Sequence, residues 1–225
     1  MHSIGTETES SLHRALKNIY KGKDGRTEVK LEGYICDAVR KDGVIIEIQT
    51  GSFGPIKTKL ETLCETHKVR LVHPIIAEKY IELYNKKGEL VSQRKSPKKL
   101  NAWDIFRVLG YAINLVTLKN LTIELAMVSA IETRIDDGKG SYHRKGKSIK
   151  DKVLCELLSR SEMKYPKDYK RFVPFKKGTT FTVQEFAKKA EISMQRAQRA
   201  LYVLSRIGIT PLHGKKGHKY VYIVQ

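Results

Sequence analysis

Three polar residues stand on one face of a predicted β-hairpin in the stretch CDAVRKDGVIIEIQ, residues 36–49. Its Lys-Asp-Gly segment favours a tight turn, and numbering the hairpin symmetrically about Asp42 places Asp37 opposite Glu47. Because side chains alternate along a strand, Asp37, Glu47 and Gln49 then share one face, while the other face is apolar. Like charges directly opposite each other destabilise a hairpin, so we expect a chemical reason for this pair.

A hard divalent cation is the simplest such reason. Mg²⁺ binds one or two carboxylates, keeps several waters and takes further ligands from substrate phosphates. Such an ion orients a water molecule for attack on a phosphodiester and lowers the pKa of that water. The pair Asp37 and Glu47 therefore predicts a site for Mg²⁺ or Mn²⁺. The alternative is an edge hairpin with solvated acids on its outer face.

The order Asp, nine residues, Glu-x-Gln resembles the PD-(D/E)XK nuclease superfamily, whose core hairpin carries Asp and (Asp/Glu)-x-Lys. In that superfamily the preceding helix often supplies another acid. Glu9 fills this place here, with His13 one turn later, and Glu7 is the alternative acid. The resemblance implies that a metal ion is bound by Asp37, Glu47 and Glu9. It implies that the catalytic residues are Glu9, Asp37, Glu47 and Gln49.

The sequence departs from the superfamily pattern at three points. No Pro precedes Asp37, Ala38 follows it, and Gln49 stands where Lys is usual. A Gln side chain orients a water or a phosphate but carries no charge to neutralise one. Lys57 or Lys59, in the helix expected next, is the candidate for a displaced positive charge.

The elements predicted around the hairpin are those that such a site needs. The expected order over residues 6–76 is helix, three strands, helix, strand, followed by a hairpin around Lys87 and Gly88. This order predicts an α/β fold with a PD-(D/E)XK restriction-endonuclease-like core in a domain of residues 1–100. Residues 101–177 are expected to be a helical connector with a basic linker. Its predicted segments are helices at 102–116, 121–135 and 151–160 and a linker at 136–150.

The last segment, residues 178–225, predicts a winged-helix DNA-binding domain. A short helix, a turn and a longer helix ending at Gly208 are followed by two strands around a Gly/Lys turn. The residues expected to contact DNA lie on the second helix and at the wing tip: Gln195, Arg196, Gln198, Arg199, Lys215, Lys216 and Lys219. A winged helix used for protein contacts is the alternative.

Charge supports a polyanionic partner. The chain of 225 residues has a formal net charge of +19. Residues 1–138 hold 22 Lys and Arg against 18 Asp and Glu, whereas residues 139–225 hold 21 against 6. A basic half of this kind is typical of nucleic-acid binding, and we expect duplex or branched DNA, with RNA left open.

Other features narrow the class of protein. The three cysteines, Cys36, Cys64 and Cys155, show no metal-ligand spacing and are expected to be buried thiols of a reducing compartment. The polar N-terminus and the lack of a long apolar run predict a cytoplasmic protein without membrane contact. The sequence is also compatible with a homodimer.

These features of the sequence lead to two functional hypotheses from different classes. The first is a metal-dependent DNA endonuclease that is held on its substrate by the winged helix. The second is a catalytically inactive nuclease-fold regulator or adaptor that only binds DNA, an alternative that Gln49 favours.

Overall fold

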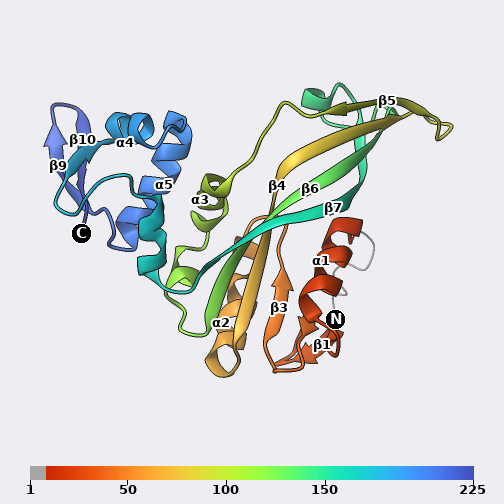
Figure 1. The fold of residues 1–225 in the computed structure, drawn as a ribbon, viewed down its shortest axis with the longest axis horizontal. Helices are drawn as coiled ribbons and strands as arrows, with labels where there is room; N and C mark the ends of the chain where they lie inside the picture. Colours follow the sequence, from red (N-terminus) through yellow and green to blue (C-terminus); the bar gives the residue numbers. More distant parts are fainter. Residues whose placement is uncertain (1–8) are drawn as a thin grey trace.

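The computed structural model describes residues 9–225. Its main body is a mixed seven-stranded sheet with helices on both faces, which confirms the predicted α/β class (Figure 1). In sheet order the strands are β1 (Arg26–Leu31), β2 (Tyr34–Val39), β3 (Ile45–Ile48), β4 (Val69–Tyr84), β6 (Leu121–Ile135) and β7 (Ser148–Met163), and β5 (Leu90–Lys95) pairs with β4. The pairs β3–β4 and β4–β6 are parallel, and the other pairs are antiparallel.

Two helices cover opposite faces of this sheet. Helix α1 (Ser11–Lys21) begins after the N-cap Ser10 and ends at Gly22, and its apolar side packs on one face of β2, β3 and β4. Helix α2 (Lys57–Thr66) packs through Leu60 and Leu63 on the other face. Successive residues of a strand point to opposite faces, which is why one strand serves both helices.

The helical prediction for the middle of the chain is wrong in two places. Residues 121–135 and 151–160 lie in strands β6 and β7 of the large sheet. The β6–β7 pairing shifts register at three points, and each shift interrupts the alternation of side chains that identifies a strand. Strand β6 is also buried on both faces over much of its length, and its central residues 125–128 form a continuous apolar run without alternation.

The predicted connector is therefore part of the sheet. Within 101–177 the helical structure consists of α3 (Ile105–Leu109) and of short 3₁₀ turns: η2 (Ala102–Asp104), η3 (Ile113–Thr117), η4 (Tyr142–Arg144) and η5 (Pro166–Phe172). The expected linker is the connection between β6 and β7. The large sheet thus crosses the predicted domain boundary at residue 100.

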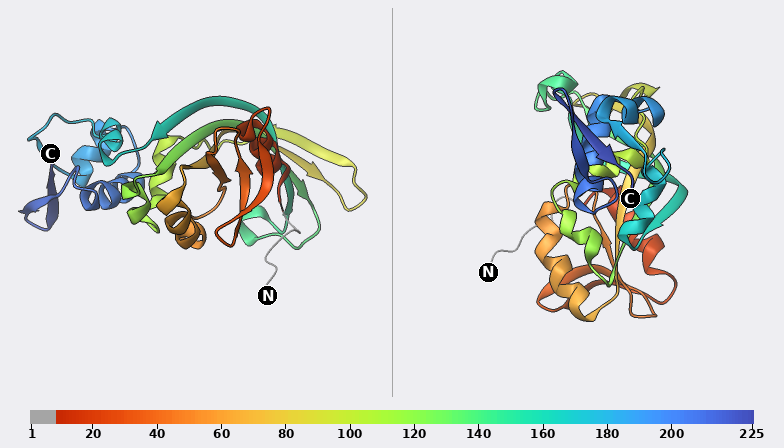
Figure 2. Two further views of the ribbon diagram at one scale, coloured as in Figure 1. Left: turned by 90° about the horizontal axis from the view of Figure 1, so that it is seen from below. Right: turned by 90° about the vertical axis from the view of Figure 1, so that its left-hand side faces the viewer.

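Two helices and a hairpin form the C-terminal unit, at the left end of Figure 1. Its elements are β8 (Thr180–Thr182), α4 (Val183–Lys189), α5 (Met194–Arg206), β9 (Leu212–Lys216) and β10 (Lys219–Ile223), with sheet order β8–β10–β9. Phe181 and Phe186 belong to the same apolar cluster as Phe106 of α3 and Leu63 of α2. The unit lies at one end of the sheet in the left view of Figure 2, and it shares a core with the sheet.

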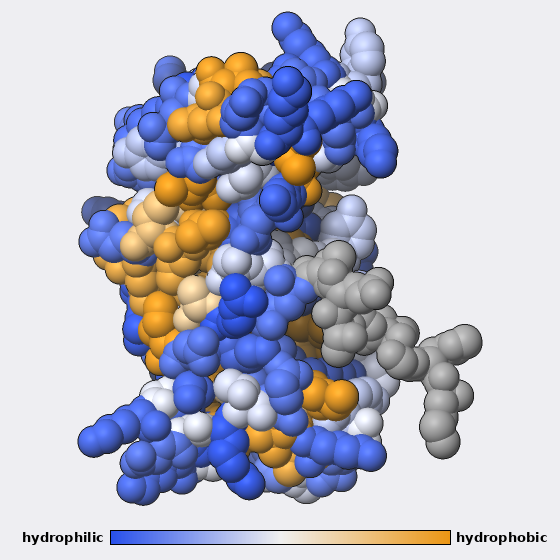
Figure 3. Space-filling view, turned by 90° about the vertical axis from the view of Figure 1, so that its right-hand side faces the viewer, coloured by the Kyte–Doolittle hydropathy of each residue, from blue (hydrophilic) through white to orange (hydrophobic). Residues whose placement is uncertain are grey.

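The opposite end of the molecule carries the β4–β5 hairpin. Seen from that end, hydrophobic areas show between hydrophilic side chains (Figure 3). Leu90 and Val91 of the edge strand β5 are 54% and 57% exposed. The homodimer that the sequence allows stays a prediction.

The expectation of buried cysteines holds for Cys36 and Cys64 but is wrong for Cys155, which is exposed on β7. Among the helices formed by residues 9–225, none is long and apolar enough to cross a membrane.

Candidate active site

Strands β2 and β3 diverge beyond two paired positions, and Asp37 and Glu47 lie where the divergence begins. We call this region the β2–β3 fork. The strands pair at Val39–Ile45 and Ala38–Ile46, which is the register predicted by symmetry about Asp42. Beyond these pairs, Oδ2 of Asp37 accepts a hydrogen bond of 2.7 Å from the backbone amide of Ile48. The Asp37 side chain thus bridges the two strands where their regular pairing ends.

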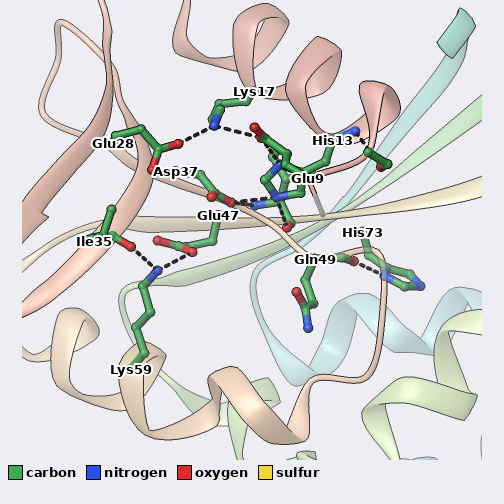
Figure 4. A network of polar contacts seen from close by, with 12 residues as sticks. Glu9, His13, Lys17, Glu28, Ile35, Asp37, Glu47, Gln49, Lys59 and His73 are labelled. Carbon is green, nitrogen blue, oxygen red and sulfur yellow. Dashed lines mark hydrogen bonds and ion pairs between the residues drawn. The ribbon is translucent and has the colours of Figure 1, made fainter. Parts of the chain in front are cut away.

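Helix α1 brings a cation to Asp37 from one face of the sheet (Figure 4). Nε2 of His13 lies 3.2 Å from Oδ2 of Asp37, and Nδ1 lies 2.6 Å from Oε1 of Glu9. Nζ of Lys17 lies 2.8 Å from the same Glu9 oxygen. Glu9, His13 and Lys17 are four residues apart, so their side chains lie on one side of α1 and of the residues just before it.

The pKa of His13 reflects this arrangement. Burial by itself lowers that pKa, but the hydrogen bonds and charges of Asp37 and Glu9 outweigh the effect and raise it to about 9. His13 is therefore a cation at neutral pH, and both of its ring nitrogens donate. The same contacts hold the pKa of Asp37 below its ordinary value against the opposing effect of burial.

Helix α2 brings a second cation from the other face. Nζ of Lys59 donates to Oε2 of Glu47 at 2.7 Å and to the carbonyl oxygen of Ile35 at 2.7 Å. Lys59 is one of the two residues predicted to supply a displaced positive charge. The other, Lys57, lies instead 3.9 Å from Glu61.

Glu47 is 4% exposed, and its second oxygen, Oε1, is buried without a hydrogen-bond partner among residues 9–225. Burial raises the pKa of Glu47 to about 7; the charge of Lys59 opposes this rise and the charge of Asp37 adds to it. The charge of Asp37 contributes to the raised pKa of Glu47. The predicted single face for the two carboxylates is not what the contacts show, because His13 reaches Asp37 from the α1 face and Lys59 reaches Glu47 from the α2 face.

These groups fit a hard divalent cation through two carboxylates. Within residues 9–225, Oε1 of Glu47 makes no regular hydrogen bond, although the Cys36 thiol, the backbone amide of Asp37 and the charge of Asp37 all act on this carboxyl group. Mg²⁺ needs only one or two carboxylates when water and phosphate oxygens complete its shell. The part of the chain that is described holds no cluster of three or more His, Cys, Asp or Glu side chains arranged to bind a metal.

Two predicted site residues are placed differently. Glu9 contacts His13 and Lys17, and the alternative acid, Glu7, lies outside the described residues. The side-chain amide of Gln49 donates to the carbonyl oxygen of Ser52 at 2.6 Å and is turned away from the carboxylates (Figure 4). Because β3 ends at Ile48, the alternation that would align Gln49 with Glu47 does not extend to it.

One neighbour of the site was not identified from the sequence. His73 of β4 is buried, and its Nδ1 donates to the backbone oxygen of Gln49 at 2.6 Å. Burial lowers the pKa of His73, while the hydrogen bond to Gln49 raises it less. A His within an apolar strand is the only signal that the sequence gives, and it does not specify a partner.

The residues predicted to contact DNA are mostly exposed. Gln195 and Gln198 on α5 and the three lysines of the β9–β10 hairpin are exposed, and Arg199 is partly so. Arg196 differs, because its Nη2 lies 2.8 Å from Oδ2 of Asp104 and fixes α5 to the turn η2. Lys219 donates to Oε1 of Gln184 at 2.7 Å.

Fold and site together define an α/β protein with two charge-compensated carboxylates in a strand fork, extended by a helix–turn–helix and hairpin unit. The chain belongs to the family described as a domain of unknown function (DUF8091), which matches residues 10–164. It is 31% identical over 220 residues to an uncharacterized protein of Treponema pallidum (strain Nichols), covering 98% of this chain and 87% of that protein. No solved structure matches the chain.

The matched range has a structural meaning. It begins at the N-cap of α1 and ends just after β7, so it includes every strand of the large sheet. The family match therefore covers the complete sheet of this chain, β6 and β7 included.

Proposed function

We propose that the protein is a metal-dependent DNA endonuclease in which Asp37 and Glu47 bind Mg²⁺ or Mn²⁺. The observation that carries this proposal is the buried Oε1 of Glu47, which makes no regular hydrogen bond within residues 9–225, on a carboxyl group whose pKa the charge of Asp37 helps to raise. Leaving a buried carboxylate oxygen without a partner costs stability. A cation ligand offsets that cost.

The fold supports this proposal. The order α1, β1, β2, β3, α2, β4 is the order expected for a PD-(D/E)XK core, and the two acids lie on the hairpin that carries them in that superfamily. Lys59 reaches Glu47 from α2 and brings the positive charge that Gln49 lacks. Glu9 and Lys17 hold His13 against Asp37.

Each side chain then has a task. A bound divalent ion lowers the pKa of a coordinated water and stabilises negative charge on the phosphate. Asp37 and Glu47 provide anionic oxygens, and Ile48 fixes the carboxylate of Asp37 through its amide. Lys59 opposes the rise that burial causes in the pKa of Glu47, and it would present its positive charge to the scissile phosphate. Cationic His13 orients Asp37 from the opposite face.

The C-terminal unit supplies the DNA contacts in this proposal. It acts as a winged helix, with α5 and the basic β9–β10 hairpin directed at duplex or branched DNA. The support is the charge of residues 139–225, where 21 Lys and Arg face 6 Asp and Glu.

Plasmid nicking with Mg²⁺ or Mn²⁺, beside EDTA, tests the activity. Asp37→Asn and Glu47→Gln should each lose most cleavage, and the double variant should lose little more, because both groups act on one ion. Asp42→Asn, in the turn of the same hairpin and exposed, is the matched control. Mn²⁺ binding followed by electron paramagnetic resonance provides a second readout, which should weaken in both site variants and not in the control.

The inactive regulator or adaptor remains the second candidate because one observation favours it. The side chain of Gln49 is bound to Ser52 and does not reach the carboxylates. Gln49→Lys separates the two functions. If the natural protein binds DNA without cutting it and this variant cuts, the chain is a DNA-binding protein with a catalytically inactive nuclease fold. If neither cuts duplex, branched or single-stranded substrates, the endonuclease proposal is wrong.

A further inference from the structure

A groove lies between α3 and α5, on the side of α5 that carries Gln198. Its volume is about 420 Å³, and it lies away from the β2–β3 fork. The residues that line it are Phe106, Arg107, Gly110, Tyr111, Gln198, Arg199 and Tyr202.

Two tyrosine rings are accessible in this groove. Tyr111 is 72% exposed and Tyr202 is 46% exposed. The backbone at Gly110 passes close to the Tyr202 ring, since a Cβ atom built on this residue would lie 4.0 Å from that ring, in ordinary van der Waals contact. The guanidinium carbon of Arg206 lies 4.7 Å from the Tyr202 ring centroid. Exposed rings next to arginines are the components of a surface that stacks nucleobases.

The charge around the rings has one sign. Arg107, Arg199 and Arg206 form no ion pair with any residue in 9–225, and no acidic residue lines the groove. Arg196, on the same helix, is by contrast paired with Asp104. Three uncompensated guanidinium groups around two aromatic rings are complementary to a ligand with a flat π-face and a phosphate.

We propose that this groove binds an unpaired nucleotide, whose base stacks on Tyr202 and Tyr111 and whose phosphate is bound by Arg107 and Arg199. The inference rests on the proposed DNA function and names its substrate class: DNA with an unpaired strand next to a duplex, as in branched or overhanging DNA. The amide of Gln198 contacts the edge of the base. A continuous duplex keeps its bases stacked and does not fill the groove.

The groove is connected to the candidate active site through α3. Arg107 lies close enough to His73 for its charge to act on the imidazole, and His73 holds the backbone of Gln49, directly after the fork. An unpaired strand in the groove would thus be bound by the same rigid elements that position the β3 end of the site.

Fluorescence anisotropy measures the binding, with short oligo(dT), a blunt duplex and the same duplex carrying a single-stranded overhang as probes. Tyr202→Ala and Tyr111→Ala should each weaken binding of oligo(dT) and of the overhang by about fivefold or more, the loss of one stacked base. Binding of the blunt duplex should stay unchanged. Tyr202→Phe should bind like the natural protein and Tyr202→Leu like the alanine variant, because the π-face is what matters.

Tyr165→Ala is the matched control, since Tyr165 is 47% exposed and also lies beside lysines. The inference is overturned if Tyr202→Ala binds oligo(dT) like the natural protein, or loses blunt duplex to the same degree. It is also overturned if poly-glutamate of equal charge competes as well as oligo(dT), which would assign the groove to an acidic peptide. A protein that binds blunt duplex without preferring the overhang refutes this inference alone. A protein that binds no DNA refutes the proposed function as well.

Discussion

Replacing the three lysines of the β9–β10 hairpin should reduce DNA affinity in a salt-dependent manner. Lys215, Lys216 and Lys219 are exposed at the tip of this hairpin, at the far left of Figure 1. Their contacts are peripheral: Lys215 lies 5.1 Å from the ring centroid of Tyr220, and Lys219 donates to Gln184. The triple Lys→Gln variant should therefore fold normally.

The magnitude follows from counterion release. Each phosphate that a lysine neutralises contributes about −0.9 to the slope of log K against log salt, so three contacts contribute about −2.7. Between about 50 and 200 mM salt this slope corresponds to an affinity loss of about 40-fold, which the triple variant would no longer show. This 40-fold value is an upper bound, since Lys219 gives up its hydrogen bond to Gln184 when it contacts a phosphate.

Fluorescence anisotropy over a salt series measures the slope. The matched control replaces Lys86, Lys87 and Lys145 by Gln. These lysines are equally exposed, on the β4–β5 turn and the β6–β7 connection, away from the hairpin (Figure 1). If the hairpin variant keeps the natural slope, or if both variants lose the same amount, the hairpin does not contact phosphates and the winged-helix interpretation is refuted.

Point substitutions are preferable to a deletion here. Residues 178–225 contribute Phe181, Phe186 and Leu204 to the cluster that also contains Phe106 and Leu63 of the main body. Removing them would expose that cluster. A loss of binding in the truncated chain would then report unfolding, whereas the lysine variant leaves the core untouched.

Two further predictions concern stability. Tyr20→Phe should lower the free energy of unfolding by about 1.5–3 kcal/mol in urea denaturation, because the buried Tyr20 hydroxyl donates to the buried carboxylate of Glu124. Glu132→Gln should cost a similar amount, about 1.5–3 kcal/mol, at neutral pH. Burial favours a raised pKa of Glu132, but the hydrogen bonds of Arg134 and Lys79 outweigh it and lower the pKa below its ordinary value of 4.5. Its contribution should be complete above pH 4.5 and disappear as pH falls through the lowered folded-state pKa, so the two proteins should converge in acid.

Each of these has its control. Tyr84→Phe removes the same kind of bond, from a tyrosine hydroxyl to Glu82 at 3.1 Å, at a less buried position, and should change stability much less. Equal losses for both tyrosines would contradict the role given to burial. For Glu132, a stability difference from the Gln variant that persists unchanged well below pH 4.5 would show that shape, and not the charge, holds this position.

The sequence predicted the parts of the fold that depend on local chemistry. The register of the β2–β3 hairpin follows from a turn and an alternation that both lie within residues 36–49. The caps of α1, Ser10 and Gly22, are likewise local. Strands β6 and β7 could not be identified in this way, because their bulges disturb the alternation and their pairing joins residues far apart in the chain.

The site was predictable to the same extent. Asp37 and Glu47 were identified because the turn aligns them, and Lys59 was one of two candidates because it lies in the helix expected after the hairpin. Gln49 was assigned a catalytic place by extending the alternation one residue beyond the end of β3. The contact between His13 and Asp37 depends on how α1 docks on the sheet, which no short segment encodes.

The fork itself explains how two acids are tolerated at opposed positions. Their repulsion would destabilise an isolated hairpin. Here His13 compensates Asp37 from the α1 face and Lys59 compensates Glu47 from the α2 face, so each acid has its own cation. The pair can exist only when both helices are docked, and the site is therefore a property of the complete three-layer core. Truncating one partner of a buried ion pair is costly because the other charge remains buried. Two apolar residues at these positions would stabilise the hairpin at least as well as two buried ion pairs, and this supports the proposal that Asp37 and Glu47 bind a metal ion.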